Sequence, residues 1–211
     1  MISIIIPSFN EANYLESTIK TVRSQHPPHE IIVVCNGCTD GTEKIAKKLA
    51  DKTIILKTRG VSKARNVGAS HASYSRLVFL DADTKLTPGV LEELLKVHGF
   101  GTARVVAESN KLKDKIFFGL KNVEHYFYSS SGFIFCSKGI FHHAGGFEES
   151  RSKFEDGRFL CRASKFGNFH ILKNPVMTST RRYEKKGYLG TVWFWVKEYF
   201  FPSNKEYDAI R

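Results

Sequence analysis

The amino-acid sequence predicts a single α/β domain whose central sheet is mostly parallel and is covered by helices on both faces. Short runs that are apolar throughout, such as residues 3–6 and 31–34, are typical of strands buried on both sides. They alternate with segments in which apolar residues recur every three or four positions, the spacing of an amphipathic helix. The 211 residues, 42% of them hydrophobic and 25% charged, fit one large domain and exclude a disordered or fibrous chain.

The first half of the chain alternates strands and helices without a break. A strand at 3–6 is followed by a helix through Leu15, Ile19 and Val22, whose spacings of four and three place them on one face. The strand at 31–34 precedes a helix that Asp40 or Thr42 can cap. The other elements expected here are a strand at 53–56, a helix at 62–71, a strand at 77–80, a helix from about Pro88 and a strand at 104–107.

The second half is less regular, and it contains neither a linker nor an internal repeat. Its expected elements are a helix within 115–128, a strand at 133–136, a helix at 155–166, a strand at 169–172 and a last helix after Gly187.

The charge and the cysteines restrict the partners and the compartment. Against 32 Lys and Arg stand 21 Asp and Glu, and the net charge of +11 favours an anionic partner: nucleic acid, an acidic membrane face or a phosphorylated small molecule. The first residues do not resemble a signal peptide, and no run of about 18 apolar residues predicts a membrane span. We expect free thiols at all four cysteines and a cytoplasmic protein.

Polar residues follow three of the predicted strands, at 7–11, 35–42 and 81–83. In open α/β sheets the ligand crevice lies beyond the carboxyl ends of the strands, so these clusters are expected to meet there. Asp81 and Asp83 are two residues apart and would project to the same side of an extended chain, where they suit Mg²⁺ or Mn²⁺ bound to a diphosphate. The alternative is a solvated turn with an Asp cap.

A basic segment at 59–68 precedes these aspartates. It can bring Arg59 or Arg65 to a phosphate, or it can hold the aspartates themselves. A solvated basic helix face is the alternative.

Cys35 and Cys38 have the Cys-x-x-Cys spacing that also occurs in thioredoxin-like redox sites and in zinc sites. Residues 37–41 predict a turn before the next helix, whereas a redox pair lies at the helix start. Cys136 and Cys161 are not spaced as a second pair for zinc. We therefore expect neither site.

The helix predicted at 155–166 offers a general base. Its apolar residues, with Phe159 and Ala163 among them, lie three to ten positions beyond Asp156, so that Asp156 is expected on the inward face. A carboxylate there can take a proton from an acceptor hydroxyl. The alternative is an acid that only complements the helix dipole. Glu155 is expected nearer Arg158 and Arg162, in structural pairs.

Six short motifs occur in order along the chain. They are Pro-Ser-Phe-Asn-Glu at 7–11, Asn-Gly-x-Thr-Asp-Gly-Thr at 36–42, Ala-Arg-Asn-x-Gly at 64–68, Leu-Asp-Ala-Asp at 80–83, Gly-Gly-Phe at 145–147 and Glu-Asp at 155–156. With them the chain resembles the family 2 glycosyltransferases of the GT-A fold over about residues 2–175. One departure is that this family commonly has Asp where the chain has Cys35, and often where it has Asn36.

The resemblance implies a sugar transfer from a nucleotide-diphosphate donor, usually with inversion and with a divalent metal, here Mn²⁺ or Mg²⁺. Asn36 would face the base, Asp81 and Asp83 would meet the ribose and the metal-diphosphate, and Asp156, beside Glu155, would be the catalytic base. The nucleotide-binding residues expected from the motifs and the strand-end clusters are Pro7, Ser8, Asn10, Glu11, Asn36, Arg59, Arg65, Asp81, Ala82 and Asp83. We expect a nucleotide-binding half at 1–108, an acceptor-side half at 109–175 and a basic segment with an aromatic helix at 176–211.

The aromatic helix leaves its own alternatives open. At about 1.5 Å per residue, the apolar segment 188–201 reaches roughly 20 Å, too short to span a bilayer. Its Trp and Tyr residues, next to Arg181, Arg182, Lys185 and Lys186, suit a membrane interface at the inner face of the membrane, while docking on the core or on a second copy is equally compatible.

The leading hypothesis is thus an inverting, metal-dependent glycosyltransferase that acts on a hydroxyl or lipid-linked acceptor. The alternatives are a polyprenyl-phosphate sugar transferase and a noncatalytic protein that binds nucleotide sugars or nucleic acid. We expect no nucleic-acid partner, because the basic residues are scattered and no nucleic-acid-binding motif is recognisable.

Overall fold

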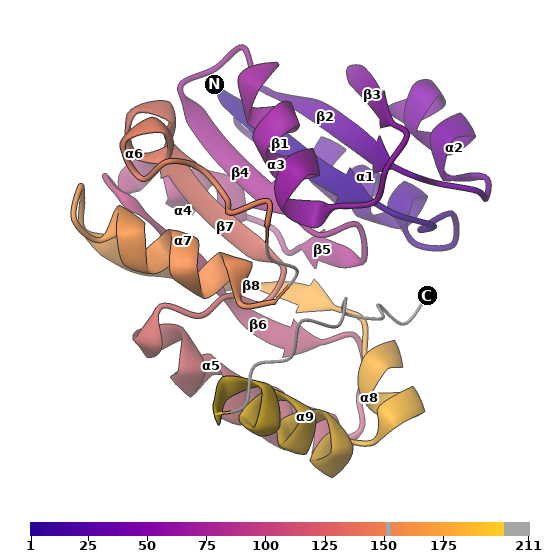
Figure 1. Ribbon diagram of the computed structural model, residues 1–211, viewed down its shortest axis with the longest axis vertical. Coiled ribbons are helices and arrows are strands. Elements are labelled where there is room, and N and C mark those ends of the chain that lie inside the picture. Colours follow the sequence, from indigo (N-terminus) through magenta and orange to yellow (C-terminus); the bar gives the residue numbers. More distant parts are fainter. Residues whose placement is uncertain (151–152, 201–211) are drawn as a thin grey trace.

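The computed structural model describes residues 1–150 and 153–200 and has one eight-stranded sheet in the order β3-β2-β1-β4-β7-β6-β8-β5 (Figure 1). The amino-terminal part of the sheet is parallel. It consists of β1 (Ile2–Ser8), β2 (His29–Asn36), β3 (Lys52–Leu56) and β4 (Arg76–Leu80). The carboxyl ends of these strands therefore meet at one edge, as expected from their apolar runs.

The second half of the sheet mixes strand directions. β7 (Phe133–Ser137) runs antiparallel between β4 and β6 (Phe100–Ala107), and β8 (Phe169–Thr178) runs parallel to β6. The short β5 (Thr84–Leu86) pairs antiparallel with β8 at the edge. Four of these seven pairings are parallel, which confirms the mostly parallel sheet.

Helices cover both faces of the sheet and create two hydrophobic cores. Alternate residues of β1 point to opposite cores: Ile4 and Ile6 to one, Ile5 to the other. The first face carries α1 (Leu15–Arg23), α2 (Thr42–Leu49), α4 (Val90–Lys96), α5 (Leu112–Glu124) and α8 (Arg181–Lys186). The second face carries α3 (Val61–Ser70), α6 (Lys138–His143) and α7 (Glu155–Ala163).

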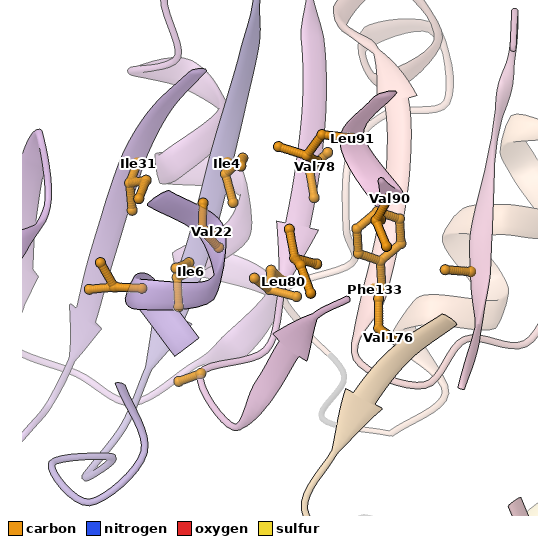
Figure 2. Close-up of a cluster of buried hydrophobic side chains, with 14 of the residues drawn as sticks. Ile4, Ile6, Val22, Ile31, Val78, Leu80, Val90, Leu91, Phe133 and Val176 are labelled. Carbon is orange, nitrogen blue, oxygen red and sulfur yellow. The ribbon is translucent and has the colours of Figure 1, made fainter. Parts of the chain in front are cut away.

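The first core extends across the whole sheet. Figure 2 shows Ile4 of β1, Val78 of β4 and Phe133 of β7 in one layer with Val22 and Leu91 from the covering helices, and all five are buried. Full burial of a side chain of this size contributes about 1.5–3 kcal/mol. The two halves of the chain therefore share one core.

Two further helices complete the chain described. The 3₁₀ helix η1 (His125–Phe127) continues α5, and α9 (Tyr188–Phe200) follows α8. In Figure 1, α5, α8 and α9 gather at the end of the molecule opposite β2 and β3. None of the helices within the described ranges is long and apolar enough to cross a membrane.

The glycine of the Ala-Arg-Asn-x-Gly motif sets how closely α3 approaches β1. A Cβ atom at Gly68 would lie 2.3 Å from Cγ2 of Ile5, well inside contact distance. Only a residue without a side chain lets the helix backbone lie directly on the strand. The motif thus fixes the position of Arg65, one turn earlier on the same helix.

Several expectations about elements were wrong in detail. β5, α6 and α8 were not predicted, because segments of three to six residues show no measurable periodicity. β6 begins at Phe100 rather than at residue 104, and β8 continues past 172 to Thr178. Lys173–Pro175 interrupt the apolar pattern of β8, and the pairing with β6 shifts its register there.

The segment after β4 was also predicted incorrectly. Extended geometry was expected at Asp81–Asp83, but the amide of Thr84 donates to the carbonyl of Asp81 at 3.0 Å and closes a turn. The two aspartates therefore do not share one side of a strand.

Candidate active site

The loops that follow β1 and β2 are joined by hydrogen bonds. Asn10, at a positive φ of 54°, accepts from the amide of Thr39 at 2.8 Å through Oδ1. The amide of Glu11 donates to Oγ1 of Thr42 at 2.8 Å. Asn10 and Glu11 therefore bind the neighbouring loop, and together the loops form a fixed floor at the carboxyl edge of the sheet.

Pro7 and Ser8 form the end of buried β1. The carbonyl oxygen of Ser8 accepts from Sγ of Cys38 at 3.2 Å, and the Ser8 side chain is fully buried. At the carboxyl edge of the sheet, Pro7 and Ser8 therefore present backbone atoms and no polar side chain.

Asn36 and Arg59 lie beside this floor. Asn36 is only 3% exposed, and its Oδ1 has no hydrogen-bond donor within the described residues. A buried acceptor without a donor costs about 1–3 kcal/mol, so a ligand N–H at this position would be favourable. The guanidinium of Arg59 lies over the ring of Phe9, 4.6 Å from its centre, and is held at the same loops.

The Cys-x-x-Cys pair is not at a helix start. α2 begins at Thr42, whose amide donates to Oδ1 of Asp40 at 2.9 Å. The described cysteines are all free thiols, as expected. A hydrogen bond with Cys35 lowers the pKa of Cys38 to about 7, whereas the same bond and burial raise that of Cys35.

Arg65 on α3 joins three carboxylates from two distant elements. Its guanidinium lies 3.1 Å from Asp81, 3.3 Å from Glu155 and 2.5 Å from Asp156, and it stacks on Phe147 at 5.0 Å. Burial alone would lower the pKa of Arg65, but the carboxylates, Asp156 foremost, raise it above its usual value. Arg65 therefore stays charged and holds the aspartates, the second of the two roles expected for it.

Asp156 lies at the first turn of α7, and its side chain is 22% exposed. Its Oδ1 accepts from Arg65, while its Oδ2 accepts from the hydroxyl of Ser130 at 2.7 Å. Fixed donors thus orient both oxygens, and the exposed part of the carboxylate is open to a bound molecule.

Glu155 does not make the pairs that were expected. Arg158 and Arg162 pair instead with Glu148, at 3.8 and 3.5 Å. Glu155 turns toward α3 because it is the first residue of α7 and lies beside buried Arg65. Burial and the adjacent charge of Asp156 raise the pKa of Glu155 to about 7.

A second arginine holds the other aspartate of the turn. Arg181 lies 3.0 Å from Asp83 and 2.9 Å from Glu11, and its guanidinium lies over Tyr14, 4.3 Å from the ring centre. Asp81 and Asp83 are thus paired with different arginines, one from each face of the sheet. The carbonyl of Ala82 accepts from Thr18 at 2.8 Å and fixes the turn to α1.

The residues of this turn suit a divalent cation that arrives with a diphosphate. Asp81 and Asp83 supply only carboxylate oxygens, the ligands that Mg²⁺ and Mn²⁺ prefer. Within residues 1–150 and 153–200 no cluster of three or more His, Cys, Asp or Glu side chains could hold an ion by itself. Phosphate oxygens and water would therefore complete the coordination.

Sequence reasoning missed Ser130 and the role of the Gly-Gly-Phe loop. Asn66, next to Arg65, exchanges hydrogen bonds of 2.9 Å with the amide and carbonyl of Phe147, which places that ring against Arg65. Gly132, at a φ of 81°, packs closely on the turn after β4, since a Cβ atom there would lie 2.5 Å from Oγ1 of Thr84. Ser130 carried no signal, because only the fold brings it to Asp156.

The model of the family described as "Glycosyl transferase family 2" matches residues 3–174. The chain belongs to glycosyl transferase family 2. The match spans every motif on which the resemblance was based, so the α/β fold and the family expected from the sequence are both confirmed.

Curated relatives agree with this family. The chain is 38% identical to glycosyltransferase AglE of Haloferax volcanii over 91 residues, which are 39% of this chain and 30% of AglE. It is 29% identical over its whole length to GalNAc(5)-diNAcBac-PP-undecaprenol beta-1,3-glucosyltransferase of Campylobacter jejuni, of which it covers 63%. The chain thus spans less than two thirds of the length of these relatives.

Solved structures share the fold. S. aureus TarS 1–349 in complex with UDP-GlcNAc has a TM-score of 0.70 at 19% identity, over 85% of this chain and 58% of TarS. The mannosyltransferase PcManGT of Pyrobaculum calidifontis, in complex with GDP-Man and Mn²⁺, has a TM-score of 0.66 at 20% identity, over 84% of this chain and 56% of that one.

Proposed function

We propose that the protein is an inverting glycosyltransferase that moves a sugar from a nucleoside-diphosphate donor to an acceptor hydroxyl. The observation that carries this proposal is the buried guanidinium of Arg65, which contacts the strand-end aspartate Asp81 and the helix-start aspartate Asp156 at once. The donor-binding turn and a base for the acceptor therefore lie side by side.

The donor side consists of the loops at the carboxyl ends of β1, β2 and β4. The orphan Oδ1 of Asn36 accepts an N–H of the base, and Arg59, held on Phe9, approaches the nucleotide. Glu11 and Asp83 would face the ribose and diphosphate after Arg181 has shifted from between them or turned to the phosphates. Pro7, Ser8, Asn10 and Ala82 shape the pocket through the backbone and the loop contacts.

The acceptor side is Asp156. Its carboxylate takes the proton of the acceptor hydroxyl while that oxygen attacks the anomeric carbon and the bond from this carbon to the diphosphate oxygen breaks. One direct displacement inverts the anomeric configuration. Ser130 and Arg65 hold Asp156 in position, since both donate to its oxygens.

A divalent ion, Mn²⁺ or Mg²⁺, would be held by Asp83 and Asp81 together with the diphosphate. When bound, it stabilises the negative charge that develops on the departing nucleoside diphosphate. Its binding requires that the aspartates exchange at least part of their contact with Arg65 and Arg181.

We propose a lipid-linked saccharide as the acceptor. The support is the Campylobacter relative, whose name describes a glucosyltransferase acting on an undecaprenol-diphosphate glycan and whose similarity extends over the whole of this chain. A soluble sugar acceptor remains the alternative outcome of the test below.

The test is a screen for nucleoside-diphosphate release. The protein is incubated with Mn²⁺, with UDP- and GDP-sugars, and with undecaprenyl-diphosphate saccharides or free sugars as acceptors. We expect release that depends on one donor and on a lipid-linked acceptor, and a product whose anomeric configuration is opposite to that of the donor. Absence of release from all combinations, or retention of configuration, contradicts the proposal.

Asp156→Asn tests the base separately. The amide keeps the shape of the side chain but cannot take a proton, so turnover should fall about 10²- to 10⁴-fold while the donor still binds. Glu92→Gln, an exposed acid on α4, is the matched control and should keep full turnover. Unchanged turnover in Asp156→Asn would remove the assigned base.

A further inference from the structure

One face of α5 is apolar and points away from the protein. Leu112, Ile116, Leu120 and Val123 follow a spacing of four, four and three, and are 71%, 57%, 65% and 55% exposed. Phe118, on the opposite side of the helix, is buried against the sheet. α5 is thus apolar on both sides, which is unusual for a helix that water covers on one side. We call these four residues the α5 stripe.

Further exposed apolar side chains lie on η1 and α9, which adjoin α5. Tyr126 and Phe127 of η1 are 74% and 79% exposed, and Leu189 and Trp193, one turn apart on α9, are 86% and 70% exposed. α5 and α9 lie together, because the ring of Tyr188 at the start of α9 is 5.0 Å from that of Phe117 (Figure 1). So many exposed apolar side chains on adjoining helices indicate a surface that contacts something other than water.

Lysines border the α5 stripe. Lys113 and Lys115 lie on its two sides around the helix, and Lys111 precedes it. Of the two acids on α5, Asp114 is buried and accepts from the hydroxyl of Tyr188, whereas Glu124 is exposed at the carboxyl end of the helix. Lys111 pairs with Glu184 at 3.3 Å. Lys113 and Lys115 therefore make the amino-terminal part of the border positively charged.

This charge discriminates between possible occupants. A second copy docked on the α5 stripe would bring together two surfaces with the same excess of lysines, because Lys113, Lys115 and Lys121 outnumber the exposed acid Glu124 on α5. Like net charges oppose such pairing. An anionic bilayer attracts the lysines and takes up the apolar side chains, and Trp and Tyr prefer its interface.

The surface also lies next to the proposed base. Phe127 ends η1, and Ser130, which donates to Asp156, follows three residues later. Three residues of chain span at most about 10 Å. A bilayer against this surface would thus bring lipid-linked molecules close to Asp156.

We propose that α5, η1 and the start of α9 form a docking surface for an anionic lipid bilayer, into which the α5 stripe inserts. The role that we assign to this surface is to bring a lipid-linked acceptor to the active site, and this role rests on the proposed function. The docking itself does not depend on catalysis and is measured without it.

The test is co-sedimentation of the full chain with vesicles. Wild type should bind vesicles of phosphatidylcholine and phosphatidylglycerol, and should bind phosphatidylcholine vesicles at least tenfold more weakly. Ile116→Asp with Leu120→Asp should weaken binding to the anionic vesicles at least about tenfold, because two exposed apolar side chains no longer insert. Lys115→Gln should weaken it about fivefold.

Ile55→Asp is the control, since Ile55 is an exposed isoleucine on β3, at the other edge of the sheet. It should bind as wild type does. Thermal unfolding of each variant checks that the fold is kept. Binding by the double variant equal to that of wild type, equal binding to neutral vesicles, or a dimer that the double variant dissociates in the absence of vesicle binding would overturn the proposal.

The same double variant separates this proposal from the proposed function. With a short-chain acceptor in detergent it should turn over as wild type does, because none of the proposed active-site residues is changed. For the wild-type protein, vesicle binding without any turnover would support the docking surface and contradict the glycosyltransferase. Turnover of the wild-type protein without vesicle binding would support the glycosyltransferase and contradict the docking surface.

Discussion

Arg65 concentrates more charge around itself than any other described residue of the site. Its side chain is 4% exposed and contacts Asp81, Glu155 and Asp156. A buried cation of this kind is stable only while its partners remain, and the partners are stable only with it. The guanidinium also presents donors in a planar fork, which the single ammonium of a lysine cannot replace.

Arg65→Met should therefore destabilise the protein by about 3 kcal/mol, since it leaves three partly buried carboxylates without a cation. Urea unfolding measures this loss. Lys63→Met, an exposed cation two residues earlier on α3, should change the free energy of unfolding by less than about 0.5 kcal/mol. Equal effects of the two substitutions would mean that the carboxylates do not depend on Arg65.

Glu155 should make stability depend on pH. Burial and Asp156 raise its pKa to about 7 from the ordinary 4.5, so between these values the folded protein binds a proton that the unfolded chain has lost. The free energy of unfolding should then fall as the pH rises from 4.5 through 7. Glu155→Gln removes this fall, which is at most about 3 kcal/mol for such a shift.

Urea unfolding of Glu155→Gln at several pH values between 4 and 8 gives the comparison. Glu92→Gln should follow the wild-type curve. Parallel curves for wild type and Glu155→Gln would show that Glu155 titrates normally.

At the scale of elements, α3 connects the two parts of the site. Its glycine lies against β1, its Arg65 reaches α7, and its Asn66 holds the loop at Phe147. The spacing between the Ala-Arg-Asn-x-Gly residues therefore has a structural reason at each position. Displacement of this helix should affect both the donor and the acceptor side.

Gly68→Ala tests that contact. The added methyl group would lie 2.3 Å from Ile5, so the helix must shift, at a cost of about 1–3 kcal/mol. Gly119→Ala on α5 is the matched control, because nothing lies within 4 Å of a Cβ atom there, and it should stabilise the helix by about 0.5–1 kcal/mol. The midpoint of thermal unfolding should thus fall for Gly68→Ala and rise for Gly119→Ala. An unchanged midpoint for Gly68→Ala would contradict the close packing of α3 on β1.

The sequence predicted the elements that carry a long periodic pattern and the motifs that carry chemistry. It did not predict contacts between them: Arg65 and Asp156 are 91 residues apart, and no local spacing relates them. Glu155 was assigned to Arg158 and Arg162 because periodicity describes only a residue's own helix. Ser130 was missed for the same reason, since a serine in a loop has no pattern.

At the scale of the whole molecule, the carboxyl edge of the parallel strands carries the proposed donor side, and α7 and the loop at Ser130 carry the proposed acceptor side. Both lie on one sheet, with α3 and α7 packed on the same hydrophobic core. The arginines now paired with the turn aspartates would be the groups that a metal-diphosphate complex must displace or recruit.

Metal removal should therefore weaken donor binding and leave the fold intact. We expect the affinity for a nucleoside diphosphate to fall at least about tenfold in EDTA and to return with Mn²⁺, because the ion links the aspartates to the phosphates. A nucleoside, which lacks phosphate, should bind equally with and without the ion. Calorimetric titration measures the affinity for the diphosphate with Mn²⁺, the same affinity in EDTA, and the affinity for the nucleoside. A diphosphate affinity that does not depend on the metal would mean that the arginines alone bind the phosphates.

In the proposed donor complex, a nucleoside diphosphate lies at the turn after β4 with Asp156 beside it. A crystal structure of the protein with GDP or UDP and Mn²⁺ tests this most directly. We expect the base at Asn36, the diphosphate and ion at Asp83, and open space between the diphosphate and Asp156. Nucleotide bound elsewhere, or aspartates still held by Arg65 and Arg181 with no ligand between them, would contradict it.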